Sequence, residues 1–183
     1  MVLLGSKAPA RNVEQHDFYF GIGEGLKALV PQMREFWPEA GSSLHIDGWR
    51  EITNVDNYRI DILENIHTDI VRNPQRLFFI NLGGYTSGRL EEQHYTLLSV
   101  HDDRVEALKN SKTTEFFKTK TIRSVRGANA HIDEKYGIDV DEIYRIEDLL
   151  SQEMKERYSI NLVKTDGLKA DEINLGYFKL ERL

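Results

Sequence analysis

The sequence predicts an α+β protein made of two tandem β-β-α-β repeats, followed by a C-terminal helix and short strands. Two observations lead to this prediction. Two blocks of sequence occur twice, in the same order, within the 183 residues. Around these blocks, short apolar runs typical of strands alternate with one amphipathic stretch per copy. We expect a pseudo-two-fold relation between the copies and a mixed or antiparallel sheet with helices on one side.

The first duplicated block is Arg-x-x-Glu-Gln-His. It is written RNVEQH at residues 11–16 and RLEEQH at residues 89–94. The second block is His-Ile-Asp, at residues 45–47 and again at residues 131–133. Identical tripeptides in the same order are hard to obtain by chance, so the pattern indicates one internal duplication.

A third match refines the alignment of the two copies. Tyr-Arg-Ile follows the second block in both copies, at residues 58–60 and 144–146. The distance between copies is eight residues larger for the later matches than for the first block. We therefore expect a longer loop in the second copy, at residues 120–130.

The alignment divides the chain into three segments that should form one compact unit. The first repeat spans residues 1–70 and the second spans residues 71–150. Residues 64–75 are polar and contain Pro74, which is typical of a linker between the repeats. Residues 151–183 have no counterpart in the first copy and should pack on the repeats as a C-terminal extension.

Each repeat should begin with a strand that ends in a glycine turn. The run LFFINLGG at residues 77–84 is continuously apolar, and VLLG at residues 2–5 is its shorter counterpart. A second strand should follow in each copy, over residues 17–20 in the first and residues 94–100 in the second.

One apolar stripe in each copy predicts a helix. Pro31 lies inside the first stripe, so a kink or two short helices are expected there. That stripe consists of Leu26, Leu29, Val30, Met33 and Trp37. Asp103 and Glu106 have the spacing of a capping box at the start of the second helix. The second stripe consists of Val105, Leu108 and Phe116.

The remaining elements follow from turn and capping residues. YRIDIL, at residues 58–63, alternates apolar and polar side chains as a strand does, and Asp56 and Asn57 can form the hairpin turn before it. Ser151 is a good N-cap for a helix that reaches about Tyr158. Two short strands, INLV and LGYFKL, then either cover a sheet edge or contact another subunit.

Composition excludes several classes of protein. The net charge of −6 and the pI near 5.5 argue against a basic surface that binds nucleic acid or anionic membranes. The absence of cysteine excludes disulfides, thiolate nucleophiles and cysteine-ligated zinc. The N-terminal apolar run is too short for a signal peptide, and no segment is long enough for a membrane span, so we expect a cytoplasmic protein.

Histidines and carboxylates in the duplicated blocks are the candidate site residues. Side chains two residues apart on an extended chain share a face, so each copy presents a Glu-x-His and a His-x-Asp pair. These residues are Glu14, His16, His45, Asp47, Glu92, His94, His131 and Asp133. Two histidines with two carboxylates suit zinc, manganese or iron, and a His–carboxylate pair also suits a general base.

Structural hydrogen bonding is the competing interpretation of the same residues. A buried histidine at a strand end is usually satisfied by a carboxylate or a backbone group. The presence of both blocks in both copies favours this structural role. Arg59 and Arg145 add two guanidinium groups that could hold an anionic ligand, or could pair with neighbouring carboxylates.

The blocks NVEQHDFYFGIGEGLKALVP, FWPEA, HIDGWREI, LFFINLGGY, HIDEKYGIDVDEIY and LGYFKL together resemble a bacterial family. That family is known only as a domain of unknown function, number fifteen forty-three. The resemblance covers nearly the whole chain and implies a small bacterial cytoplasmic protein built of repeated short domains. It implies no activity, cofactor or catalytic residue.

The sequence therefore favours a non-catalytic module that binds a small molecule or a protein partner, with a homodimer as one expected form and no cofactor assigned. The alternative is a metal-dependent enzyme of hydrolase type. It would use a divalent metal held by the duplicated Glu-x-His and His-x-Asp pairs.

Overall fold

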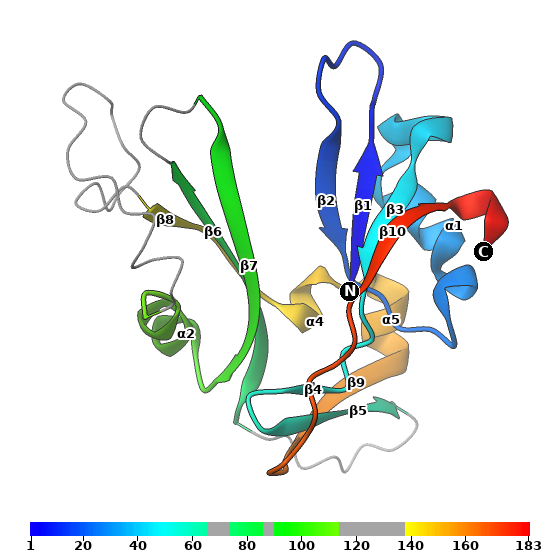
Figure 1. Cartoon of the computed structure of the whole chain (residues 1–183). Helices are drawn as coiled ribbons and strands as arrows, with labels where there is room; N and C mark the ends of the chain where they lie inside the picture. Colours follow the sequence, from blue (N-terminus) through cyan, green and yellow to red (C-terminus); the bar gives the residue numbers. More distant parts are fainter. Residues whose placement is uncertain (66–73, 86–89, 114–137) are drawn as a thin grey trace. The chain divides into compact units, whose positions relative to one another are not determined.

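The computed structural model describes residues 1–65, 74–85, 90–113 and 138–183 (Figure 1). Contacts between Cα atoms divide the chain into two units. The first unit combines Met1–Asp69 with Leu149–Leu183, and the second unit is Ile70–Asp148. The C-terminal segment therefore belongs to the first unit. No helix among the described residues is long and apolar enough to cross a membrane.

The main sheet of the first unit has four strands in the order β10-β3-β1-β2 (Figure 1). These are β1 (Val2–Ser6), β2 (Gln15–Tyr19), β3 (His45–Trp49) and β10 (Asn174–Lys179). Every neighbouring pair is antiparallel. The C-terminal strand β10 thus covers the free edge of β3, which is one of the two roles expected for it.

Helix α1 (Leu26–Phe36) packs on one face of this sheet through Tyr19. The Tyr19 hydroxyl donates to Gln32 Oε1 at 3.0 Å, and its ring meets Phe36 edge-on with centroids 5.6 Å apart. Val2, Leu4 and Tyr19 are buried on this side. Because side chains alternate along a strand, Gly5 and its strand partners lie on the opposite face.

Pro31 does not divide α1 into two helices. The helix contains Pro31 and continues to Phe36, where a 3-10 segment, η1 (Pro38–Ser43), follows. Proline removes one helical hydrogen bond. Burial of Leu29 and Met33, on either side of it, stabilises the helix across that position.

A second, three-stranded sheet of the first unit has the order β4-β5-β9. It consists of β4 (Asn54–Val55), β5 (Tyr58–Glu64) and β9 (Tyr158–Lys164), paired antiparallel. Asp56 and Asn57 have φ of 52° and 62° in the hairpin turn. Two consecutive positive φ values define the turn type that suits two-residue hairpins, so the predicted turn is confirmed.

Helix α5 (Gln152–Arg157) begins where the sequence predicts. The Ser151 side chain accepts a hydrogen bond from Met154 N at 3.3 Å, as an N-cap does. At the other end, the Asn65 side chain donates to the carbonyl oxygens of Lys155 and Glu156 at 3.2 and 3.1 Å. These contacts tie the C-terminal segment to the end of β5.

The second unit is a three-stranded antiparallel sheet in the order β7-β6-β8. Its strands are β6 (Arg76–Tyr85), β7 (Glu92–His101) and β8 (Ile138–Arg145), with helix α2 (Arg104–Ser111) against one face. The short helix α4 (Ile146–Leu149) follows β8. The core between sheet and helix consists of Phe78, Ile80, Leu82, Ala107 and Ile143.

The N-terminal cap of α2 is confirmed, and its predicted apolar stripe is partly right, because Leu108 packs against the core whereas Val105 does not. Asp103 Oδ1 accepts from Glu106 N at 2.8 Å, and Glu106 Oε2 accepts from Asp102 N at 3.2 Å. Val105 is 74% exposed, whereas Ala107 and Ser111 are buried. Small residues at i and i+4 let the helix approach the sheet, so they define its buried face. Phe116 lies outside the described residues.

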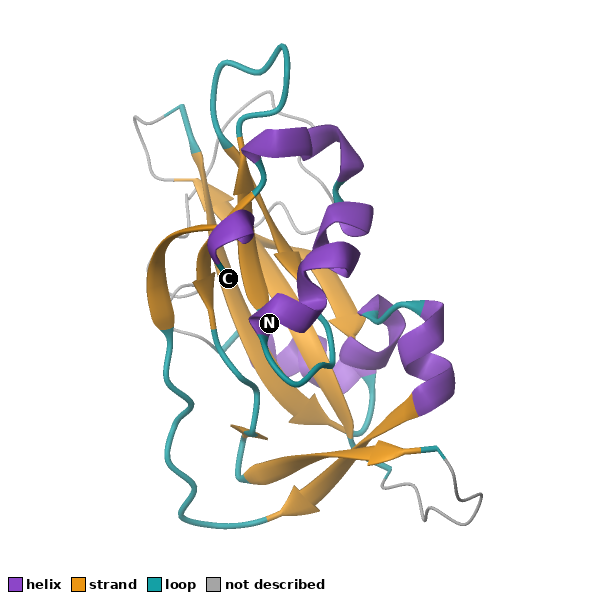
Figure 2. Ribbon diagram, turned by 90° about the vertical axis from the view of Figure 1, so that its right-hand side faces the viewer, coloured by secondary structure: helices purple, strands orange, loops and turns teal. Residues whose placement is uncertain are grey.

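The α+β class is confirmed, with three antiparallel sheets and few helices across both units (Figure 2). The expected equivalence of the two Tyr-Arg-Ile tripeptides is wrong. Tyr58 begins β5 in the small sheet of the first unit, whereas Tyr144 lies near the end of β8 and pairs with Phe79 of β6. The two tripeptides differ in their strand partners. Tyr58 lies on β5, which is paired with β4 and β9, whereas Tyr144 lies on β8, which is paired with β6.

In the second unit β8 pairs with β6, as β3 pairs with β1 in the first unit. Gly5 pairs with His16 on one side and His45 on the other. Gly83 pairs with His94 on one side and Asp139 on the other. The pairing of β1 with β3 shifts register between Leu3 and Leu4, and the pairing of β6 with β8 shifts register between Asn81 and Leu82. In each sheet the leucine directly precedes the glycine. The predicted loop at 120–130 lies outside the described residues.

Candidate functional site

Three neighbouring strands bring the polar residues of the first unit together. His16 of β2, Gly5 of β1 and His45 of β3 form a row across the sheet, because Gly5 is paired with both histidines. The row lies on the face opposite α1. Asp47 lies two residues beyond His45, where β3 bulges between Ile46 and Gly48. Glu14 lies directly before β2.

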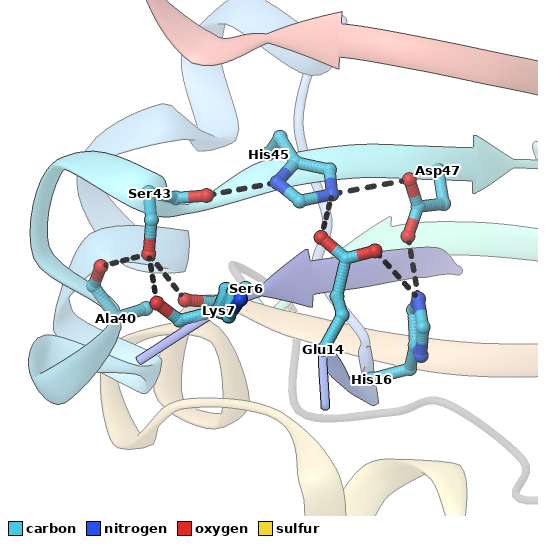
Figure 3. A network of polar contacts seen from close by, with 8 residues as sticks. All are labelled: Ser6, Lys7, Glu14, His16, Ala40, Ser43, His45 and Asp47. Atoms are coloured by element: carbon cyan, nitrogen blue, oxygen red, sulfur yellow. Dashed lines mark hydrogen bonds and ion pairs between the residues drawn. The ribbon is translucent and has the colours of Figure 1, made fainter. Parts of the chain in front are cut away.

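Glu14, His16, His45 and Asp47 form one contact network, which we call the polar cluster (Figure 3). His45 Nε2 lies 3.3 Å from Glu14 Oε1 and 3.2 Å from Asp47 Oδ1. His16 Nε2 lies 3.0 Å from Asp47 Oδ2 and 3.9 Å from Glu14 Oε2. Each carboxylate thus presents one oxygen to each imidazole.

His45 is the fixed member of the polar cluster. Its side chain is 4% exposed, whereas those of Glu14 and His16 are 45% and 46% exposed. His45 Nδ1 lies 2.8 Å from the backbone oxygen of Ser43. A carbonyl oxygen only accepts, so Nδ1 carries a hydrogen and Nε2 is the ring nitrogen that faces the carboxylates.

His45 Nε2 faces two carboxylate oxygens and is buried without a hydrogen bond. Both oxygens lie within 3.3 Å, yet neither is placed to form a hydrogen bond with this buried nitrogen. Asp47 Oδ2 is likewise buried without a hydrogen bond. Buried polar atoms without partners are uncommon and often belong to functional sites.

Gly5 leaves the space that the polar cluster occupies. A Cβ atom at this position would lie 2.3 Å from Asp47 Oδ2 and 2.5 Å from His45 Nε2. Real Cβ atoms essentially never approach other atoms so closely, so any larger residue would displace both side chains. The glycine is required by side-chain space and not by backbone conformation.

Contacts behind His45 hold its ring in place. Ser43 Oγ donates to Ala40 O at 2.7 Å and lies 2.7 Å from the hydroxyl of Ser6, which is fully buried (Figure 3). The ring of Tyr177, on β10, packs against His45 with centroids 4.4 Å apart and the ring planes tilted by 36°. A residue of the C-terminal strand therefore contacts the imidazole that β3 provides.

The four side chains of the polar cluster contact one another directly. Within the described residues, no group of three or more histidines and carboxylates is placed so that it could hold a metal ion. Each carboxylate contacts both imidazoles. Glu14 and His16 are half exposed and sit at the edge of the cluster, so they have room to reorient.

The second unit places its candidate residues differently. His94 Nε2 lies 3.8 Å from Glu92 Oε2, and His94 Nδ1 lies 3.3 Å from Asn81 Nδ2. Asn81 also donates to Glu142 Oε2 at 2.8 Å. His94 is half exposed. His131 and Asp133 lie outside the described residues.

The two candidate arginines are not part of either histidine group. Arg59 donates to both oxygens of Asp61 at 2.8 Å, and Arg145 donates to both oxygens of Asp148 at 2.8 Å. Hydrogen bonds and the charge of the carboxylate raise the pKa of each guanidinium. The structure thus shows the carboxylate pairing that was expected as the alternative to anion binding.

Gly5, Ser43 and Tyr177 complete the site, and sequence reasoning did not assign them to it. Gly5 carried a signal, because Leu4-Gly5 and Leu82-Gly83 recur at the same place in the two copies. Tyr177 carried none, since it lies more than a hundred residues from His45 along the chain. Only the pairing of β10 with β3 brings it there.

Comparison with known proteins supports part of the resemblance seen in the sequence. Residues 11–62 match a family described as Domain of Unknown Function (DUF1543). This segment includes all four members of the polar cluster and spans less than a third of the chain. The family matches the chain once, so a second tandem copy of this domain stays a prediction. No curated protein matches the sequence significantly.

A solved structure shares the fold. The chain is similar to the crystal structure of a protein Il1583 from Idiomarina loihiensis, with a TM-score of 0.56. The alignment covers 98% of this chain and 94% of that chain, at 19% sequence identity. At this identity the similarity concerns the fold alone.

Proposed function

We propose that the protein is a non-catalytic binding module whose ligand site is the polar cluster of the first unit. The observation that carries the proposal is the position of His45 Nε2, which is buried, lacks a hydrogen bond and faces two carboxylate oxygens. Leaving such an atom unsatisfied costs about 1–3 kcal/mol. A ligand that interacts with it would recover this free energy.

The surroundings of the cluster support the same proposal. Gly5 leaves room for the side chains of His45 and Asp47, which occupy the position that a Cβ atom would take. Tyr177 packs against the buried ring, while Glu14 and His16 stay accessible. The buried His45 is held in place by the fold, and the half-exposed Glu14 and His16 are accessible from solvent. Ligand sites commonly combine such pre-formed groups with access from the surface.

We further propose that the second unit is a duplicated copy of the first sheet and helix. Within the described residues, both units follow the order strand, strand, helix, strand. The glycines Gly5 and Gly83 have the same position relative to their two neighbouring strands. The homodimer and the cytoplasmic location expected from the sequence stay predictions.

A metal-dependent hydrolase is the second candidate. The observation that favours it is the donor set itself, since two imidazoles and two carboxylates are ligand types common to catalytic zinc sites. It predicts esterase or phosphatase activity that requires His16 and Asp47. Turnover of model esters or phosphate monoesters, lost in His16→Gln, would replace the binding proposal with this one.

A ligand screen tests the binding proposal directly. Thermal unfolding of the untagged protein is followed against a panel of metal ions, anions and small metabolites. We expect at least one compound to raise Tm in the wild type and not in Asp47→Asn. His94→Gln is the matched control, because it alters a half-exposed histidine of the second unit. Equal shifts in all three proteins would exclude the polar cluster as the ligand site.

A further inference from the structure

We infer that the second unit binds a small zwitterion, an α-amino acid with an apolar or aromatic side chain, in a cavity beside the start of helix α2. The cavity has a volume of about 430 Å³. Small-molecule sites commonly measure about 300–1,000 Å³. All the residues that line the cavity belong to the second unit, so the inference is independent of the polar cluster.

The cavity lies at the end of the sheet where β6 begins and β8 ends. Helix α2 begins there at Arg104 and meets the core of the unit through Ala107, one turn later. Phe78 and Ile143 belong to the same core and also line the cavity. They give it an apolar wall, against which an aliphatic or aromatic side chain of a ligand can be buried.

Two arginines extend this wall with polar groups. Arg76 lies two residues before Phe78, and Arg145 lies two residues after Ile143, so each arginine shares a sheet face with its apolar neighbour. Both arginines line the cavity. Arg145 donates to both oxygens of Asp148 at 2.8 Å, and Asp148 lines the cavity as well. This pair is a neutral part of the wall.

Three consecutive exposed residues of the lining, Asp102, Asp103 and Arg104, carry polar atoms that the fold does not use. Asp102 Oδ1 accepts from Gln75 Nε2 at 2.9 Å, and Asp103 Oδ1 accepts from Glu106 N at 2.8 Å. The second oxygen of each carboxylate accepts no hydrogen bond from the described residues. Within the same part of the chain, the Arg104 guanidinium makes no ion pair and no hydrogen bond.

These unused groups define the class of ligand. A guanidinium presents a planar fork of donors that matches a carboxylate, and carboxylate oxygens accept from the three donors of an ammonium group. Arg104 therefore suits the carboxylate of a ligand, and Asp102 and Asp103 suit its ammonium group. Three arginines and three aspartates line the cavity, so their charges sum to zero. An α-amino acid carries both groups and no net charge at neutral pH, which matches this balance.

The test is a titration of the full, untagged, isotope-labelled chain with L-phenylalanine and L-leucine at neutral pH, followed by amide chemical shifts. We expect shifts at residues 102–104 and 143–145, and none at the polar cluster. Phenylpropionate lacks the ammonium group, and phenethylamine lacks the carboxylate. Each should bind at least about tenfold more weakly than L-phenylalanine, because each loses the charge-assisted hydrogen bonds of one group.

Variants of exposed side chains supply the second readout. Arg104→Gln and Asp102→Asn should both fold, because each alters an exposed residue. Each should weaken L-phenylalanine binding at least about tenfold. Lys109→Gln is the matched control, because it removes an exposed cation of α2 that is not part of the cavity lining. It should bind within about twofold of the wild type.

Three results would overturn the inference. They are the absence of shifts around the cavity with millimolar amino acid, equal affinity for phenylpropionate and L-phenylalanine, and unchanged affinity in Arg104→Gln. Asp47→Asn, in the first unit, should bind L-phenylalanine as the wild type does. Loss of binding in that variant would place the amino acid at the polar cluster, which would overturn this inference and support the binding function proposed above.

Discussion

At the scale of single residues, the site depends on one imidazole and one glycine. His45 is buried and held by Ser43, so its orientation is fixed before any ligand arrives. Gly5 is the residue that permits this arrangement, because its neighbours occupy the space of a side chain. The sequence predicted that Glu14 and His16 share a face, and that His45 and Asp47 do. It could not predict that the pairs meet, since strand pairing decides that.

Gly5→Ala tests whether the space beside β1 belongs to the site. The added methyl group would contact Asp47 and His45, so we expect both side chains to shift and ligand binding to be lost. The strand should persist, because alanine accepts an extended conformation. Chemical shifts of the His45 ring report the displacement. Gly83→Ala, at the same register in the second unit, is the control. Unchanged His45 shifts in Gly5→Ala would contradict the role given to Gly5.

Tyr19 gives a prediction about pH. Burial, with a smaller effect of the Glu35 carboxylate, raises the pKa of the Tyr19 hydroxyl to about 12. An ordinary tyrosine loses its proton near pH 10. The associated stability is therefore fully present below pH 10 and is lost as pH rises toward 12. The loss is on the order of 2 kcal/mol.

Tyr19→Phe keeps the ring on Phe36 and removes the titrating group. Its free energy of unfolding should fall less steeply between about pH 10 and 12 than that of the wild type. Urea unfolding at a series of alkaline pH values measures the difference. Parallel pH profiles for the two proteins would show that Tyr19 does not titrate in this way.

At the scale of secondary-structure elements, local signals were accurate and long-range pairing was not foreseen. The N-caps Asp103 and Ser151 and the turn at Asp56 depend on neighbouring residues, so the sequence predicted them. The equivalence of Tyr58 with Tyr144 failed, because it required knowing which strands pair. Val105 was assigned to the wrong face, since a short helix can bury small residues as readily as large ones.

Asp171 connects the C-terminal segment to the beginning of β4, and its replacement tests that connection. Its carboxylate accepts from Thr53 N and Asn54 Nδ2 at 3.0 Å each, and also from Thr53 Oγ1. The side chain is 6% exposed. Asp171→Asn should lower the free energy of unfolding by about 1–3 kcal/mol, because hydrogen bonds to a charged, buried acceptor are weakened or lost. Asp166→Asn, exposed in the same segment, should change it little.

Denaturant unfolding followed by circular dichroism measures this difference. Equal midpoints for Asp171→Asn and Asp166→Asn would mean that the carboxylate does not hold the segment. A lower midpoint for Asp171→Asn with an unchanged slope would confirm the loss of stability without a change in the unfolded state.

At the scale of the whole molecule, the first unit is discontinuous in sequence. Its main sheet needs β10, its small sheet needs β9, and both come from the segment after residue 148. The sequence predicted that this segment packs on the repeats, from its lack of a counterpart. It gave no sign that the segment joins one unit, because that follows from pairing between distant strands.

A chain that ends at residue 148 tests this dependence. Removal of β9 and β10 would expose β3, β5 and the ring of His45, so we expect the first unit to lose its fixed structure. Amide resonances of residues 1–65 should collapse toward unfolded positions. Retention of wild-type positions for β1, β2 and β3 would show that the repeat is stable by itself.

The proposal that the polar cluster exists for binding, and not for stability, has a direct thermodynamic test. Urea unfolding of Glu14→Gln/His16→Gln, compared with the wild type in the presence of a chelator, measures what the cluster contributes without a ligand. Exposed ion pairs contribute about 1 kcal/mol at most, and the variant also removes a carboxylate that faces His45 Nε2. We predict equal or greater stability for the variant. A free energy of unfolding lower by more than about 2 kcal/mol would contradict the proposal and show that the cluster is structural.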